Sequence, residues 1–227
     1  MFMIYCFFND YNFNFITFIE NIKTFIDDER LKNKALRYRL DGNGCVAFAY
    51  KEIDNWYFSL SGSSCDYYGK LELSKWGKKQ TLNEAYNIIE NALKEYINKK
   101  CKVVNFNINK CHLTENTRRY VLYGDIFLSS SVTLKNEVEA KNAIEGLNQH
   151  YSCCERKILT YIGGGFVNPD YLKPKPSANN ILKKYTFIIK YDPCKRCMPA
   201  LFGCNNIITK NGNRSIVKNN NVFECKP

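Results

Sequence analysis

Three cysteines in this sequence have the types and spacing of a zinc site. Cys194 and Cys197 lie three positions apart in "DPCKRC", where a helix capped by Asp192 and begun by Pro193 would turn both sulfurs toward one point. We expect the N-terminus of that helix to lower the pKa of both thiols. Cys153 would add a third sulfur from the irregular first turn of another predicted helix. Three thiolate ligands leave the fourth position of zinc open, as in catalytic sites.

Glu155 follows Cys153 by two positions, which is close enough to serve the metal without binding it. A C-x-E motif followed by P-C-x-x-C is the zinc deaminase pattern in its three-cysteine form. In that scheme Glu155 transfers protons between the zinc-bound water, the ring nitrogen of the base and the leaving amine. Cys154 would pack behind the helix. The alternatives are a redox pair or a structural four-cysteine zinc site, for which Cys154 or Cys204 is available as the fourth ligand.

The segments "GCVAFAYKEIDNWYFSLSG", "CCERKIL", "YDPCKRC" and "NNIITKNGNRSIV" together resemble the cytidine deaminase-like superfamily, and most closely the deaminase domains of bacterial polymorphic toxins. The resemblance implies an α/β fold with three layers (α/β/α), in which helices enclose a mixed five-stranded sheet whose last two strands are antiparallel. It implies a Zn²⁺ site at the starts of two adjacent helices. It also implies hydrolytic removal of an exocyclic amine from a base, most often cytosine to uracil.

Substrate contacts are expected from residues that flank this site. Some belong to the N-V-A-x-A-like first strand and the Ser-Gly end of the second, and others adjoin the cysteines. These candidates are Asn43, Val46, Ala47, Ser61, His150 and Pro193.

The basic composition suggests a polyanionic partner. The chain has 33 Lys and Arg residues against 22 acidic residues, a formal net charge of +11. A Lys- and Asn-rich proteome would produce the same charge, so the charge alone decides nothing. With the abundant Tyr and Phe, it suits single-stranded or flipped-out DNA or RNA. The cations nearest the site elements are Lys173, Lys175, Lys183, Lys184, Lys195 and Arg196.

Two other functions stay open. A free-nucleoside cytidine deaminase shares the three-cysteine ligation, but the charge suits a neutral nucleoside poorly. A non-catalytic, zinc-stabilised nucleic-acid-binding module would keep its binding after Glu155→Ala and would never convert a base. The toxin resemblance adds an immunity protein as a further possible partner.

The cysteine usage indicates a reducing compartment. The 11 cysteines cannot all pair, and their spacing lacks the regularity of a disulfide-stapled domain. The apolar start, "MFMIYCFFNDYNFNFITF", has no basic n-region, so we expect no cleaved signal, and no segment reaches membrane-spanning length. We therefore expect the protein to act in the cytoplasm, including the cytoplasm of a target cell into which it is delivered.

The expected elements follow the hydrophobic pattern. We predict an N-terminal helical segment over 1–40 and a deaminase domain over 41–227 with an insertion at about 63–150. Thr81 and Glu84 form a capping box for a helix that reaches residue 100. The other predicted elements are one or two helices in 14–38, strands at 45–51, 55–61, 101–108, 118–134, 185–191, 205–209 and 214–218, and helices at 134–148, 153–162 and from 192 onward.

Overall fold

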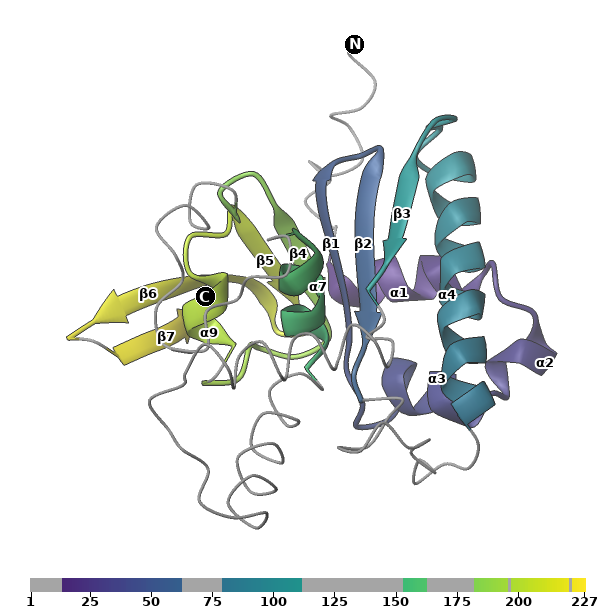
Figure 1. Ribbon diagram of the computed structural model, residues 1–227, viewed down its shortest axis with the longest axis horizontal. Helices are drawn as coiled ribbons and strands as arrows, with labels where there is room; N and C mark the ends of the chain where they lie inside the picture. Colours follow the sequence, from purple (N-terminus) through teal and green to yellow (C-terminus); the bar gives the residue numbers. More distant parts are fainter. Residues whose placement is uncertain (1–13, 63–78, 112–152, 163–181, 196, 221) are drawn as a thin grey trace, which may run out of the picture.

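A computed structural model describes residues 14–62, 79–111, 153–162, 182–195, 197–220 and 222–227. Their strands form one open mixed sheet of seven strands, in the order β3-β2-β1-β4-β5-β6-β7 (Figure 1). The pairs β2/β3 and β4/β5 are parallel, and the other neighbours are antiparallel. The strands are β1 (Val46–Glu52), β2 (Asn55–Leu60), β3 (Asn107–Lys110), β4 (Thr186–Ile189), β5 (Asn206–Thr209), β6 (Gly212–Asn219) and β7 (Val222–Lys226).

This sheet confirms the mixed α/β class but is larger than the five strands that were predicted. The two additional strands, β3 and β7, are its edges. The predicted hairpin over 45–61 is confirmed as β1 and β2, and the strands predicted at 205–209 and 214–218 form the antiparallel pair β5/β6. Lys210 and Asn211 make the turn between that pair, and Gly212 follows it with a φ of 107° that favours glycine.

Residues 14–45, the described part of the segment before β1, contain three short helices, where the pattern predicted one or two. Each begins after an Asn or Asp whose side chain accepts a hydrogen bond from the backbone N–H three residues on. Repeated capping residues therefore divide the segment. These helices are α1 (Phe15–Lys23), α2 (Asp28–Leu31) and α3 (Lys34–Leu40), with Asn14, Asp27 and Asn33 as their caps.

Helices cover both faces of the sheet (Figure 1). Val46 and Phe48 point into a core shared with α1, α3 and α4 (Lys79–Lys99). Ala47 and Ala49 point to the other face, where their core includes residues of α7 (Cys154–Ile162) and α9 (Met198–Leu201). This alternation follows from the two-residue period of a strand. The described part of the predicted N-terminal segment thus shares its core with the sheet.

The described part of the predicted insertion also builds the fold. α4 packs against α1 and α3, and its Tyr86 hydroxyl hydrogen-bonds with Ser59 Oγ and the backbone of Leu60 at the end of β2. The helix predicted there is confirmed, but it begins at Lys79, so Thr81 lies inside it and does not cap it. The elements predicted at 118–134 and 134–148 lie outside the described residues.

Among the described residues, the helices that the structure contains are too short or too polar to cross a bilayer.

Candidate metal centre

The first turn of α7 carries Cys153 and Glu155. Cys153 directly precedes the helix, and its carbonyl accepts the backbone N–H of Lys157 at 3.3 Å, which starts the helical hydrogen bonding. This is the irregular first-turn position that was predicted. Because α7 packs on β1 and β2, the helix holds Cys153 and Glu155 beside the start of the first strand.

Cys194 and Cys197 lie in a turn, because the helix that was predicted to open at Asp192 and Pro193 begins only after them, at Met198. The N–H of Cys197 bonds the carbonyl of Cys194 at 2.8 Å, and α9 begins only at Met198. The predicted lowering of the thiol pKa by a helix N-terminus therefore loses its structural basis. The turn still brings both cysteines to the same point.

Asp192 has tertiary partners in place of the predicted helix. Its carboxylate accepts a hydrogen bond from the hydroxyl of Thr209 at 2.7 Å and forms an ion pair with Arg214 at 3.2 Å. These contacts lower the pKa of Asp192 against the opposing effect of burial. The residue thereby ties the cysteine turn to the β5/β6 hairpin.

The three predicted ligands come together. The sulfurs of Cys153, Cys194 and Cys197 all lie within 4.8 Å of one another. Two sulfurs bound to one tetrahedral zinc at about 2.3 Å each lie about 3.8 Å apart, so this group fits a zinc ion. Among the described residues, no fourth metal-ligating atom belongs to the group, and Cys204 and Cys154 stay outside it. Cys194 is exposed, so the group is open to solvent on its side.

The thiols of this group resist ionisation without a cation. The hydrogen bond with Cys194 raises the pKa of Cys153 to about 12, and the contact with Cys153 raises the pKa of Cys197 as well. Crowded sulfurs cannot all carry negative charge unless a cation neutralises them. A divalent metal ion would favour the ionised thiolates and would release their protons as it binds.

Glu155 lies beside the three sulfurs but is not one of the group's ligands. Its side chain is buried, with 6% exposed, and burial raises its pKa. The carboxylate accepts a hydrogen bond from the Cys154 thiol, with 3.3 Å between Sγ and Oε2. A buried carboxyl group of this kind holds a proton more readily than an exposed one.

A second group adjoins the first and was missed by the sequence analysis. It contains Cys45, Cys154 and Glu155, and its ligand atoms also lie within 4.8 Å of one another. Cys154 is fully buried against the sheet, as predicted. Cys45 directly precedes β1 and places its sulfur 3.1 Å from that of Cys154. The two residues are distant in sequence, and no local pattern connects them.

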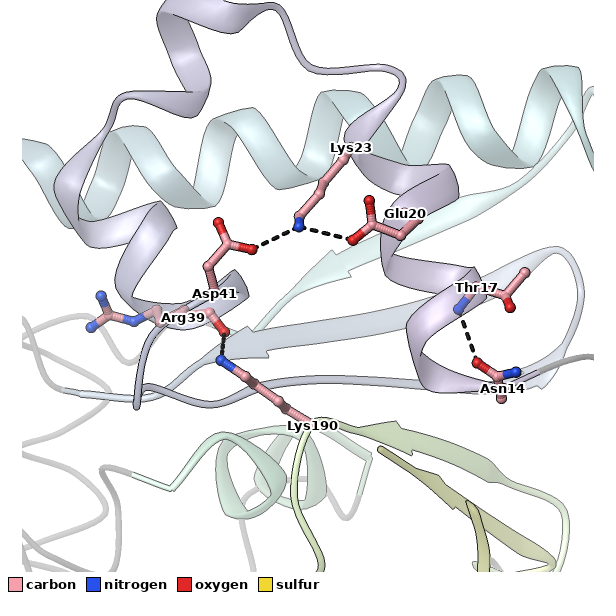
Figure 2. A network of polar contacts seen from close by, with 7 residues as sticks. All are labelled: Asn14, Thr17, Glu20, Lys23, Arg39, Asp41 and Lys190. Carbon is pink, nitrogen blue, oxygen red and sulfur yellow. Dashed lines mark hydrogen bonds and ion pairs between the residues drawn. The ribbon is translucent and has the colours of Figure 1, made fainter. Parts of the chain in front are cut away.

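Buried cations surround the start of β1. Lys157 donates to the carbonyls of Leu60, at 2.7 Å, and Gly62. Lys190, directly after β4, donates to the carbonyls of Arg39, at 3.0 Å, and Gly42 (Figure 2). Figure 2 also shows Lys23 joining Glu20 of α1 to the residue after α3, Asp41. Backbone carbonyls thus hold Lys157 and Lys190, and these contacts fix the loops on either side of the site.

The residues predicted to contact substrate occupy different positions. Val46 is fully buried in the core on the opposite face, so its side chain does not face the cysteines. Ala47 is buried under α7, and Pro193 is buried beside Cys194 in the chain. Ser61 accepts the N–H of Cys45 through its hydroxyl at 2.8 Å. Asn43 is exposed in the turn before β1. The cations Lys183, Lys184 and Lys195 are also exposed. The other predicted residues, His150, Lys173, Lys175 and Arg196, lie outside the described residues.

Comparisons with protein-family models, with curated proteins and with solved structures found no match to this chain.

Proposed function

We propose that this protein is a zinc-dependent deaminase that converts cytosine to uracil in DNA or RNA. The observation that carries the proposal is the pairing of three converging cysteine sulfurs with a buried carboxyl group, Glu155, that lies beside them but outside the ligand group. A catalytic site of this class needs metal ligands and a separate acid–base group. In a cell the enzyme would act as a toxin or effector.

Cys153, Cys194 and Cys197 would hold the zinc. Zinc in such a site supplies a bound water whose pKa falls to about 7. Because the described residues offer three ligands and Cys194 is exposed, a fourth position toward solvent is available for water or substrate. A structural four-cysteine site would need another sulfur, and within the described residues neither Cys154 nor Cys204 joins the group.

Glu155 would move the protons. Burial raises its pKa from that of an ordinary glutamate, which brings proton uptake and release closer to neutral pH. It can therefore accept a proton from one reacting group and return it to another. The hydrogen bond from the Cys154 thiol orients one carboxylate oxygen, Oε2.

The topology supports the proposal at the level of the scaffold. The strands β2-β1-β4-β5-β6 form a continuous mixed set of five inside the larger sheet, and their last pair is antiparallel. A mixed set of five strands with an antiparallel last pair agrees with the sheet that the resemblance to deaminases implies, inside a larger sheet of seven. The resemblance assigns zinc to the starts of two adjacent helices; Cys153 directly precedes α7, and Cys194 and Cys197 lie in the turn that leads into α9.

The net charge of +11 supports nucleic acid as the substrate, because a basic surface attracts the phosphate backbone. Lys183, Lys184 and Lys195 are exposed and lie on either side of β4, which leads into the cysteine turn. A free nucleoside would gain little from this charge.

The test is sequencing of single-stranded DNA, duplex DNA and RNA after incubation with the zinc-loaded protein. We expect C-to-T changes in at least one pool. Glu155→Gln should abolish them while zinc content and fold are retained, because glutamine preserves the shape but cannot exchange protons. Glu95→Gln, on the exposed face of α4, is the matched control and should keep full activity.

Two results would contradict the proposal. Equal conversion by wild type and Glu155→Gln would remove the proposed role of the carboxyl group. Nucleic-acid binding without conversion in any pool, and unchanged by Glu155→Gln, would instead identify a zinc-stabilised binding module.

A further inference from the structure

Cys45 and Cys154 are a close thiol pair from distant parts of the chain. Their sulfurs lie 3.1 Å apart, although the residues are 109 positions apart in the sequence. Cys154 is buried at the first position of α7, whereas Cys45 is partly exposed before β1. An oxidant therefore has access to one sulfur of the pair, and the other lies in contact with it.

The backbone on both sides of the pair is fixed. The N–H of Cys45 donates to the hydroxyl of Ser61, and the carbonyl of Cys45 accepts the N–H of Ser61, so Cys45 extends the β1/β2 ladder. Cys154 is held by α7, which packs on the same strands. A disulfide has sulfurs about 2.05 Å apart, so the two side chains must close about 1 Å.

A second metal ion is the alternative to a disulfide at this pair. Cys45, Cys154 and Glu155 could together offer two sulfurs and a carboxylate oxygen to a metal. Sulfurs that share one tetrahedral zinc lie about 3.8 Å apart, so a metal would have to push this pair outward. A disulfide would instead draw the sulfurs together by about 1 Å, so the zinc content of the chain distinguishes the two possibilities.

We propose that Cys45 and Cys154 form a reversible disulfide that joins β1 to α7 beside the metal centre. The reaction balances with a low-molecular-weight disulfide, such as oxidised glutathione, as oxidant. The Cys45 sulfur attacks this disulfide and releases one reduced thiol. The Cys154 sulfur then attacks Cys45 and displaces the second. The two cysteine protons leave with the two thiols, and the two cysteines are oxidised as the oxidant is reduced.

The cross-link acts on Glu155. The Cys154 thiol donates its proton to Glu155 Oε2, and a disulfide sulfur has no proton to donate. Oxidation therefore removes one of the two described donors to this carboxylate and leaves the backbone N–H of Glu155 as the other. The bond itself does not depend on the proposed function, but its effect on deamination rests on that function. We expect the oxidised protein to be less active and to recover when it is reduced.

The experiment treats the zinc-loaded full chain with oxidised glutathione and maps disulfide-linked peptides by mass spectrometry. Zinc protects Cys153, Cys194 and Cys197 during the treatment. We expect a link between the peptides of Cys45 and Cys154, lost on reduction. The closed loop should also make the denatured chain migrate faster on a non-reducing gel. Cys45→Ser should show neither signal, whereas Cys225→Ser, a control on β7, should show both.

Three results would overturn the inference: no link in the wild type, a link that joins Cys45 or Cys154 to a different cysteine instead, or a second zinc per chain lost in Cys45→Ser. Peptide mapping and zinc content do not depend on any enzymatic activity. A cross-link in a protein that deaminates no substrate would therefore support this inference while the proposed function fails. Deamination without a cross-link would support the proposed function and overturn this inference.

Discussion

Lys157 donates a hydrogen bond from Nζ to the backbone carbonyl of Leu60 at 2.7 Å, which ties the first turns of α7 to the end of β2. The lysine is completely buried, and burial lowers its pKa from the usual 10.5 to about 7. Between these two values the unfolded chain binds a proton at this residue and the folded chain does not.

The contribution of Lys157 to the stability of the zinc-free protein should therefore rise with pH between about 7 and 10.5, because in this range this residue binds a proton in the unfolded state and not in the folded state. Lys157→Met removes this contribution. The unfolding free energy of the wild type minus that of Lys157→Met should increase with pH, by at most about 1.4 kcal/mol per pH unit. Denaturant unfolding at several pH values measures it. Lys34→Met, at an exposed position of α3, should give a difference that is flat with pH.

Zinc binding should depend on Cys194. We expect one zinc per wild-type chain and almost none in Cys194→Ser, because two thiols remain and a serine hydroxyl is a poor ligand. Cys194 is exposed, so the substitution should not disturb packing. Metal analysis after dialysis tests this, with Cys225→Ser as the matched control that keeps its zinc. Loss of zinc from both variants, or from neither, would contradict a metal centre formed by these three cysteines.

The Tyr86 hydroxyl should be worth about 1–3 kcal/mol of stability, because Tyr86→Phe leaves buried groups without a partner. The hydroxyl accepts the N–H of Leu60 at 3.1 Å and contacts Ser59 Oγ at 3.1 Å. Chemical denaturation measures the change. Tyr191→Phe is the same substitution at an exposed residue whose hydroxyl bonds Gly42, and it should cost less than about 0.5 kcal/mol. Equal costs would show that α4 does not hold β2 through this network.

The sequence predicted the convergence of the zinc ligands because each cysteine is tied to a local element. Cys153 precedes an amphipathic helix, and the spacing of Cys194 and Cys197 turns both sulfurs to one side even without the expected helix. That helix start was wrong because Asp192, which has the features of a cap, bonds Thr209 instead. The tertiary contact of Asp192 with Thr209 thus overrode its local preference for capping a helix.

The edges of the sheet were harder to predict. The strand expected from residue 101 begins only at Asn107, because Lys102 has a φ of 54° and interrupts the extended run. β7 was not predicted, because its five residues, VFECK, are too few and too irregular in their alternation to give a clear period-2 signal.

The contacts of Cys45 and Lys157 depend entirely on tertiary structure. The cysteine pair spans 109 positions, which no local spacing can indicate. Lys157 has no acidic residue three or four positions away in its helix, and this was the only sequence hint that its partners lie elsewhere.

The most direct measurement of the central claim is the intact mass of defined cytosine-containing substrates after incubation with the zinc-loaded protein. A single-stranded DNA, a duplex, an RNA and free cytidine would be run in parallel, with Glu155→Gln at matched zinc content. Deamination replaces an amine with an oxygen and leaves the strand uncut, so the account predicts that small mass gain in one or more nucleic acids with the wild type alone. An unchanged mass in every nucleic acid, with zinc bound and the fold intact, would contradict it.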